Sequence, residues 1–361
     1  FEGEWKEKAM DDIFEEVIEK SRPDLPVLSI LQGVGTVLRD NFDRRISYDK
    51  ANLNSYKAMK KGDFIIHLRS FEGGLECSKH NGISSPAYKI LRTNCLVSAA
   101  YEDYFRSYNF IQGKLSIAVT GIRDGKSIDM PSFWTIKIAM PNIAEQNKIA
   151  SFLSLLNKRI EKQQQLVEAL KSYKRGVIEH YFSRQIILTD PTEKWSKCHI
   201  KDCLNYEQPQ KYIVTTEHYS NEYLTPVLTA NKAFVLGYTD ETDGIYDKGQ
   251  VIIYDDFTME AKFVEFPFKV KSSTIKMLTP KNGNNLYFLF CLLQHLQLKP
   301  EGHQRSYISI VEQMDVSIPS IKEQNRASEL FYTLNRLVKC EEGNLTHIES
   351  EKAGLLGHLF I

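Results

Sequence analysis

Three stretches of the sequence contain residue types that catalyse reactions in other proteins. Residues 121–127 (GIRDGKS) are similar to a loop that binds nucleotide phosphates, but the stretch is one residue short between its glycines and no helical pattern follows it. Gly33 and Gly35 begin a dinucleotide-binding pattern, but Leu38 stands where its third glycine belongs. We interpret both stretches as turns.

The third stretch has the residue types of a nuclease metal site, namely Asp255, Glu260 and Lys262. Its carboxylates fall in one tight turn and lack the usual strand pair, which favours a solvated turn. The nine histidines form no cluster with metal-ligand spacing, and the methyltransferase signature Asn-Pro-Pro-Phe does not occur. We therefore predict that the chain is not catalytic by itself and that it binds no metal.

Basic side chains are grouped along the chain, although the formal net charge is zero. Between Arg39 and Arg92 there are eleven Lys and Arg against six Asp and Glu. Between Lys262 and Lys281 there are five Lys against one Glu. Such patches could contact the phosphates of a nucleic acid, and chance clustering of surface lysines is the alternative.

The clearest structural pattern lies in residues 140–182, where apolar residues recur at alternating steps of four and three. This is the heptad pattern of a helix that packs along another helix. Pro141 precedes it, where proline starts a helix but does not continue one. We predict a helix over residues 146–182. Its seam is Ile149, Leu153, Leu156, Ile160, Val167, Leu170, Val177 and Tyr181, interrupted by the polar residues Gln163 and Lys174.

Residues 318–360 repeat this pattern without a gap at a shift of 178 positions. The polar interruptions correspond as well, at Glu341 and Lys352. A match of seam, interruptions and helix start favours an internal duplication over two unrelated amphipathic helices. We predict a second helix over residues 324–360, antiparallel to the first. Its seam is Ala327, Phe331, Leu334, Val338, Leu345, Ile348, Leu355 and Leu359.

The segments before the two helices read as α/β domains with a similar plan. In the first we expect helices at 11–20 and 101–110, strands at 27–31, 64–68 and 88–91, and a loop at 119–127. In the second we expect strands at 224–228, 248–253 and 272–278, and a helix at 286–293. The domains have diverged more than the helices, as expected for two variable binding domains on a common spacer.

Composition places the chain among packed, soluble proteins. Of its 361 residues 42% are hydrophobic, which is ample for cores. No apolar run approaches the length of a membrane span and no signal peptide is visible. The six cysteines are scattered, which suggests free thiols in a reducing cytoplasm. The first residue is Phe, so we expect that N-terminal residues are missing.

Several motifs carry a family resemblance that covers nearly the whole chain. They are residues 1–5 (FEGEW), 62–70 (GDFIIHLRS) and 82–88 (GISSPAY), and the Pro-x-x-x-Glu-Gln helix starts at Pro141 and Pro319. With the duplicated order of domain and helix, they resemble the DNA specificity (S) subunit of type I restriction–modification enzymes. The second domain departs from the pattern where the first has residues 83–88.

The resemblance implies an α/β fold with target recognition domains at 1–140 and 185–318. Spacer helices at 141–184 and 319–361 would form an antiparallel coiled coil that separates the domains, with an internal pseudo-two-fold repeat. It implies a cytoplasmic subunit that reads a bipartite site on double-stranded DNA. Two modification (methyltransferase) subunits and the restriction (endonuclease/translocase) subunits would be its partners. S-adenosylmethionine, ATP and Mg would be bound by those partners, and no cofactor by this chain.

On that resemblance each domain should enter a major groove, where all four base pairs can be distinguished. The predicted DNA-contacting residues are Arg44, Arg45, Arg69, Lys79, Arg123, Lys126, Lys262, Lys269, Lys271, His303, Gln304, Arg305 and Tyr307. Arg305 and Gln304 are the candidate base readers of the second domain, and its lysines are candidate phosphate contacts. The predicted docking residues for partner subunits are Pro141, Glu145, Gln146, Asn157, Pro319, Glu323, Gln324 and Asn335.

Two alternatives stay open from the sequence alone. One is the specificity subunit of a related two-subunit restriction–modification enzyme, which the sequence does not separate from type I. The other is a divergent nuclease that uses Asp255 and Glu260. The bases of the DNA target are not readable from the sequence, because base readout depends on a few side chains whose positions need a structure.

Overall fold

The central strands of both domains carry apolar side chains on both faces, because successive side chains of a strand point to opposite faces of the sheet. In β6 (Phe64–His67), Phe64 and Ile66 belong to one core cluster and Ile65 to another. In β17 (Val251–Asp255), alternate residues divide between two clusters in the same way. Each sheet is therefore covered on both sides, which explains the continuous apolar runs in the sequence.

The computed structural model describes residues 4–39, 50–67, 74–121, 127–230, 233–300 and 305–360. The chain divides into two compact units, and each contains one domain and parts of both long helices. Unit 1 comprises Phe1–Gln164 and Gly343–Ile361, and unit 2 comprises Gln165–Glu342. The contacts thus divide the chain within the two long helices.

Unit 1 is built around the antiparallel sheet β2-β9-β6-β7. The hairpin β3-β4 and the pair β5-β8 accompany it, and β1 pairs with β12 where the domain meets the long helix. The strands are β1 (Lys6–Ala9), β2 (Glu15–Val17), β3 (Leu28–Leu31), β4 (Gly35–Leu38), β5 (Lys57–Met59), β6, β7 (Glu76–Cys77), β8 (Gly82–Ser84), β9 (Tyr88–Arg92), β10 (Val119–Thr120), β11 (Ser127–Ile128) and β12 (Lys137–Met140). The helices are α1 (Met10–Ile13), η2 (Lys50–Ser55), α2 (Ser98–Phe105), α3 (Tyr108–Gly113), η4 (Leu115–Ala118) and α4 (Met130–Thr135).

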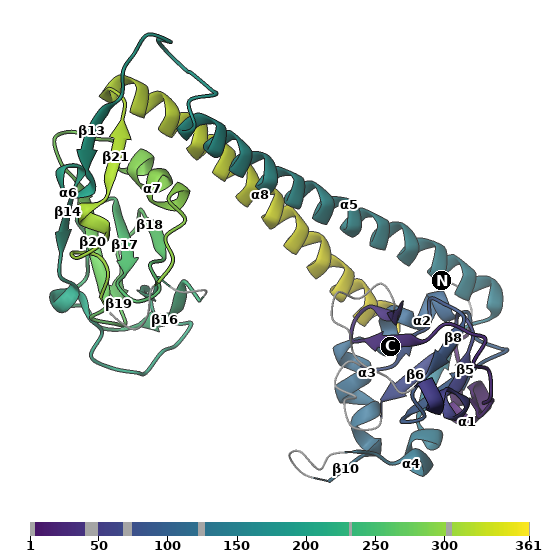
Figure 1. Ribbon diagram of the computed structural model, residues 1–361. Coiled ribbons are helices and arrows are strands. Elements are labelled where there is room, and N and C mark those ends of the chain that lie inside the picture. The colour runs from purple at the N-terminus through teal and green to yellow at the C-terminus, as the bar shows by residue number, and fades with distance from the viewer. Residues whose placement is uncertain are drawn as a thin grey trace. The chain divides into compact units, whose positions relative to one another are not determined.

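Unit 2 repeats this topology with the antiparallel sheet β14-β20-β17-β18 and the junction pair β13-β21. A second sheet has the order β16-β15-β19. Helix α7 lies beside β17 and β18 (Figure 1). The strands are β13 (Ser196–His199), β14 (Leu204–Glu207), β15 (Thr225–Leu228), β16 (Val235–Thr239), β17, β18 (Ala261–Val264), β19 (Lys269–Val270), β20 (Ile275–Pro280) and β21 (Asp315–Ile318). The helices are α6 (Ile200–Cys203), η6 (Pro209–Tyr212), α7 (Leu286–His295) and η7 (Val311–Gln313).

The two long helices, α5 (Ile143–Phe182) and α8 (Ile321–Leu359), contribute to the core of each domain. In unit 1, Ile149 and Leu153 of α5 join Leu356 of α8 in the core of the first domain. In unit 2, Tyr181 of α5 and Phe331 of α8 join the core of the second. The seam therefore continues from a helix pair into each domain.

The helices are antiparallel within each unit, as predicted. In unit 1, Gln164 Nε2 donates to Glu349 Oε1 at 3.3 Å, beyond the shared core around Leu153 and Leu356. In unit 2, Lys171 pairs with Glu342 at 3.0 Å, and Tyr181, further along α5, donates to Glu323 near the start of α8. One predicted seam position is wrong. Leu355 is 37% exposed, and Leu356 is buried in its place among the core residues of the first domain.

Both long helices begin three residues before their predicted starts, because the capping residues were missed. Asn142 Oδ1 accepts from the backbone N–H of Glu145 at 2.9 Å, and Ser320 Oγ accepts from that of Glu323 at 3.4 Å. Asn and Ser are favoured at this position because their side chains satisfy amides that the helix leaves unpaired. Asn142 and Ser320 correspond at the shift of 178 that relates the helices.

Most predicted strands are confirmed, and the errors concern short elements. The expected helix at 11–20 is instead α1 followed by β2. Phe14 and Val17 pack into two different core clusters, as side chains on opposite faces of an extended chain do. The expected helix at 101–110 is two helices, because the Ser107 side chain caps α3. The expected loop at 119–127 begins and ends in the paired strands β10 and β11.

Gln146 and Gln324 fix the long helices to their domains. Gln146 Oε1 accepts from the backbone N–H of Val97, just before α2, at 2.8 Å, and Nε2 donates to the carbonyl of Pro141 at 3.0 Å. Gln324 makes the same pair of contacts, with the N–H of Asn285 before α7 at 3.0 Å and the carbonyl of Pro319 at 3.0 Å. Each glutamine is 1% exposed. Gln146 links the start of α5 to the start of α2, and Gln324 links the start of α8 to the start of α7. We call this pair the amide clamps.

A buried ion pair between Lys269 and Glu241 connects two segments of the second domain. Lys269 of β19 is 3% exposed, and its Nζ lies 2.7 Å from Glu241 Oε2 and 2.6 Å from the carbonyl of Asp243. Glu241 Oε1 accepts from the backbone N–H groups of Thr215 and Thr216, each at 2.8 Å. Glu241 therefore ties the segment before β15 to β19.

Replacing Gln324 by alanine should destabilise unit 2. The change leaves the N–H of Asn285 and the carbonyl of Pro319 without these partners, and an unsatisfied buried polar group costs about 1–3 kcal/mol. We expect the free energy of unfolding, measured in urea, to fall by about 2–4 kcal/mol. Hydrogen exchange at the Asn285 amide should become faster. The exposed Gln210→Ala is the control and should stay within about 0.5 kcal/mol of the parent. Unchanged unfolding and exchange in Gln324→Ala would show that the clamp contributes nothing.

The Glu241 pair should make the second domain acid-sensitive. Burial alone raises the pKa of Glu241, but hydrogen bonds from Lys269, Thr216 and Thr215 outweigh it and lower the pKa from 4.5 to about 2. A depressed pKa gives stability that is present above pH 4.5 and lost as the pH falls toward 2.

Hydrogen exchange of the Thr215 and Thr216 amides, corrected for intrinsic rates, should show this loss between pH 4.5 and 2. Glu241→Gln should lower protection at neutral pH and remove the acid step. The exposed Glu222→Gln should behave as the parent. Protection that stays constant across this pH range in the parent would exclude a role for the pair.

Candidate nucleic-acid interface and helix-start sites

The predicted DNA contacts fall into residues that the structure describes and residues that it does not. Those outside the described residues are Arg44, Arg45, Arg69, Arg123, Lys126, His303 and Gln304. Lys79 is exposed just after β7, and its backbone is firmly held. Its N–H donates to Thr36 Oγ1 at 2.9 Å, and Thr36 also contacts the neighbouring Ser78 hydroxyl at 3.1 Å.

Lys271 lies directly after β19 on the surface of the second domain. Its Nζ is 2.7 Å from Glu217 Oε1 and 5.9 Å from the ring centre of Tyr219. The hydrogen bond to Glu217 raises the pKa of Lys271. A cation on an anchored strand end suits a phosphate contact, but a phosphate would have to compete with Glu217.

Two of the predicted contacts are placed inside the domain, which corrects the sequence interpretation. Lys269 is buried and its ammonium is engaged by Glu241, so it stabilises the fold and does not face a phosphate. Tyr307 is fully buried, with its ring 5.3 Å from that of Tyr254, so it is a core residue and not a base-stacking one. A strand pairing for Lys269 and a core partner for Tyr307 are tertiary facts that residue type does not reveal.

Arg305 is exposed at the start of an anchored segment. The next two residues are both hydrogen-bonded to Asp256. The Ser306 hydroxyl donates to the backbone carbonyl of Asp256 at 2.7 Å, and the Tyr307 N–H donates to Asp256 Oδ1 at 2.9 Å. Asp256 is itself held by the buried Lys276 at 3.0 Å. The backbone beside Arg305 is therefore fixed while its side chain faces solvent, as a base-reading residue requires.

Lys262 faces a different part of the unit. It lies on β18 and lines a cavity together with residues of α5 and α8, and its Nζ is 3.7 Å from Glu260.

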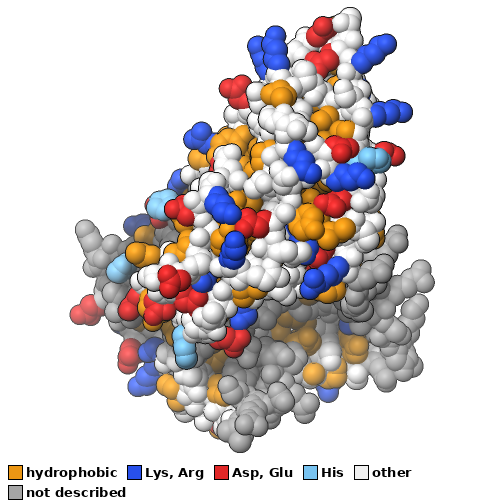
Figure 2. All heavy atoms as spheres, turned by 90° about the vertical axis from the view of Figure 1, so that its left-hand side faces the viewer, with side chains coloured by type: hydrophobic (Ala, Val, Ile, Leu, Met, Phe, Trp, Pro, Cys, Tyr) orange, Lys and Arg blue, Asp and Glu red, His pale blue; other side chains and the backbone are white. Residues whose placement is uncertain are grey.

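Figure 2 shows one face of the molecule, on which the described basic side chains are interspersed with acidic ones. This face therefore presents no single field of positive charge.

The predicted docking residues of the helix starts serve the fold in this structure. Pro141 and Pro319 are buried, and so are Gln146 and Gln324 as the amide clamps. Glu145 accepts from Trp5 Nε1 at 3.2 Å, and Glu323 accepts from Tyr181 and from the Thr189 hydroxyl. Asn157 donates to Asp103 at 3.0 Å, and Asn335 accepts from Lys174 at 3.0 Å. All these polar side chains contact their own unit.

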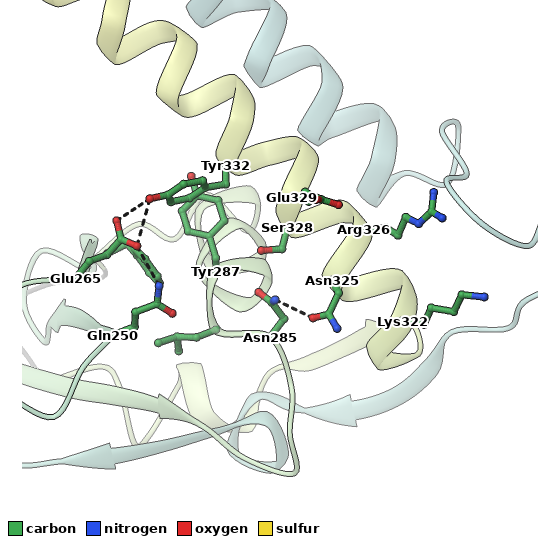
Figure 3. A pocket seen from close by; sticks show the side chains of 12 residues that line it. Gln250, Glu265, Asn285, Tyr287, Lys322, Asn325, Arg326, Ser328, Glu329 and Tyr332 are labelled. Carbon is green, nitrogen blue, oxygen red and sulfur yellow. Dashed lines mark hydrogen bonds between the residues drawn. The ribbon is translucent and has the colours of Figure 1, made fainter.

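The exposed surface beside the second clamp is a groove of about 770 Å³ between α8 and the second domain. Figure 3 shows Asn285 joined to Asn325, and Glu265 joined to Tyr332 and Gln250. Asn325, Arg326 and Glu329 are exposed on α8. Sequence reasoning missed these residues, although they follow the Glu-Gln motif at helix spacing on the opposite side from the buried residues.

Asp255 caps its own turn and is not arranged for metal binding. Its Oδ1 accepts from the N–H groups of Phe257 and Thr258 at 2.9 Å, and its Oδ2 accepts from Thr274 at 2.6 Å. In the described part of the chain, no group of three or more His, Cys, Asp or Glu could hold a metal ion. No helix of that part is long and apolar enough to cross a membrane.

Comparison with known proteins identifies relatives for both sequence and fold. The family described as "Type I restriction modification DNA specificity domain" matches residues 192–350. The specificity subunit of the type I restriction enzyme EcoR124I/EcoR124II from Escherichia coli is 48% identical over 120 residues. That alignment covers 32% of this chain and 30% of the relative, so the chain spans less than a third of the curated subunit it matches.

Solved structures show the same fold over the whole chain. The type I restriction–modification S subunit from M. genitalium matches with a TM-score of 0.64 and 15% identity, covering 100% of this chain and 97% of that one. A chain from a study of complex assembly and conformational transition of the type I system matches with a TM-score of 0.58 and 13% identity, covering 98% and 97%. Residues 192–350 thus match the type I DNA specificity domain, and the whole chain shares the fold of the solved S subunits.

Proposed function

We propose that this chain reads a two-part site on double-stranded DNA and positions two modification subunits, together with restriction subunits, around it. The observation that carries the proposal is the duplicated topology. Both domains use the same strand order and the same entry into a long helix, while their surface segments differ. A duplicated frame with divergent surfaces suits two different half-sites and two similar docking positions. S-adenosylmethionine, ATP and Mg would be bound by the partners.

In the first domain Lys79 is the described residue best placed to contact DNA. In the second domain Arg305 is the candidate base reader and Lys271 the candidate phosphate contact. An arginine can bind guanine through two hydrogen bonds in the major groove, whereas a lysine beside an acid is suited to the less directional contact with phosphate. Lys269 and Tyr307 are not part of this surface.

Arg305→Ala and Lys271→Ala should therefore have different effects on DNA binding. Arg305→Ala should cost about 1–3 kcal/mol on the cognate duplex and relax discrimination in one half-site only. Lys271→Ala should weaken binding to all duplexes and reduce the dependence of affinity on salt. The measurement is the affinity of the assembled complex for the cognate duplex and for duplexes altered in either half, at two salt concentrations.

Glu217→Gln is the matched control, because it removes the acid that competes for Lys271. It should raise affinity for all duplexes alike. If Arg305→Ala binds every duplex as the parent does, the reader assignment is wrong. If it weakens both halves equally, Arg305 contacts phosphate.

Partner docking should depend on the exposed groove and not on the buried clamp residues. Arg326→Glu reverses a charge on this groove without touching the core, so the fold should be preserved. Native mass spectrometry with excess modification subunit should show two copies per parent chain and one per Arg326→Glu chain. Lys197→Glu makes the same charge change on the exposed strand β13 and should keep two copies. A parent complex that stops at one copy would overturn the proposed stoichiometry.

A further inference from the structure

Lys352, the polar residue that interrupts the seam near the end of α8, is paired in unit 1 with the carboxylate of Asp103. Lys352 Nζ lies 2.6 Å from Asp103 Oδ1, and Asn157 Nδ2 donates to Asp103 Oδ2 at 3.0 Å. Asp103 comes from α2, so one carboxylate joins α2 to both long helices. The Lys352 and Asp103 side chains are 18% and 12% exposed, so the pair is largely removed from water.

Unit 2 contains the same arrangement without the carboxylate. Lys174 and Asn335 are the counterparts of Lys352 and Asn157 at the shift of 178 positions, and Lys174 Nζ donates to Asn335 Oδ1 at 3.0 Å. Counted from the residue that each amide clamp holds, Asp103 is the sixth after Val97 and Cys291 is the sixth after Asn285. A thiol therefore stands in α7 where α2 has an acid.

The Cys291 thiol does not replace that negative charge. It is 2% exposed, and burial raises its pKa from 9.0 to about 12, so it is neutral at physiological pH. Burial also lowers the pKa of Lys174. The nearby Glu342 pairs with Lys171 at 3.0 Å. No carboxylate of the described residues lies within 4 Å of Lys174, and the amide nitrogen of Asn335 has no partner among them.

A cavity of about 310 Å³ lies against Lys174, Cys291 and Asn335. Lys262, Arg336 and Lys339 add positive charge to its walls, and apolar rings cover the remainder, including Phe290 and Phe331. Its one acidic lining residue, Glu265, already accepts from Tyr332 and Gln250 on the side shown in Figure 3. The cavity lining thus combines four cationic side chains with apolar rings, and its volume lies at the lower end of the range of small-ligand sites.

We propose that this cavity binds a carboxylate carried on an apolar group, which takes the place that Asp103 occupies in unit 1. The carboxylate accepts from Lys174 Nζ and Asn335 Nδ2, as Asp103 does from Lys352 and Asn157. The apolar group lies against the rings. The carboxylate can belong to a free organic acid or to an acidic side chain beside an aromatic residue of a peptide. The titration that tests this site contains no DNA, so its outcome does not depend on the proposed DNA reading.

The test is calorimetric titration of the full chain with phenylacetate and with the uncharged phenylacetamide. Phenylacetate should bind one site per chain at least tenfold more tightly than phenylacetamide. Cys291→Asp supplies the missing carboxylate and should weaken phenylacetate binding at least tenfold, while raising the melting temperature. Cys291→Ser keeps the position neutral and should bind as the parent does. Lys174→Met should remove the preference for phenylacetate, and serves as a second variant should Cys291→Asp fold poorly.

A third ligand, N-acetyl-Phe-Glu-amide, identifies the source of the carboxylate. Tighter binding of the peptide than of phenylacetate supports a protein segment as the occupant, and the reverse order supports a free acid. Equal binding of phenylacetate and phenylacetamide by the parent would overturn the proposal. Unchanged phenylacetate binding in both Cys291→Asp and Lys174→Met would overturn it as well, because binding would then be elsewhere. Loss of DNA binding has no bearing on any of these outcomes.

Discussion

The placement of each domain on its long helix depends on one buried amide. Gln146 and Gln324 each present an acceptor to the first free N–H of a domain helix and a donor to the proline carbonyl before the long helix. An amide group is planar, so satisfying both ends fixes the distance and direction between the two helix starts. The cost of leaving these groups unpaired in the core makes any other placement unfavourable. The strand pairs β1-β12 and β13-β21 add a second attachment at the same junction.

This junction explains why the domains cannot be understood apart from the helices. Neither domain closes its own core, because α5 and α8 supply buried side chains to both core clusters at the junctions. A helix of forty residues gains most of its stability from the apolar face that it buries. Domain and helix therefore stabilise one another. Exposed side chains such as that of Arg305 can differ between the domains without disturbing this shared core.

The sequence predicted the elements whose signals are periodic or repeated, and missed those that depend on tertiary partners. The heptad seam placed both long helices, the alternation of domain and helix along the chain gave their antiparallel direction, and apolar runs placed β6 and β17. Residue type alone misassigned Lys269 and Tyr307, because an ammonium near a surface strand and a ring near a loop read as binding groups until their burial is known. The true helix starts were visible as Asn142 and Ser320, each three residues before a glutamate. The prediction that Leu355 is buried was wrong, because this end of α8 packs against the core of the first domain, where Leu356 is buried instead.

The two halves of a duplicated chain can share a residue because both need it to fold or because both bind the same kind of partner. The contacts in the structure help to distinguish these causes. The paired Pro and Gln of the helix starts make the same contacts in both halves, so their identity is explained without a partner. Positions that correspond in space but differ in chemistry carry other information. Asp103 and Cys291 stand at equivalent sites beside equivalent lysines, yet only one of the two lysines has an acid. A folding requirement common to both halves would have kept the acid in both. The acid is therefore not a requirement of the shared fold, and its absence from unit 2 leaves the position at which the proposed ligand would supply a negative charge.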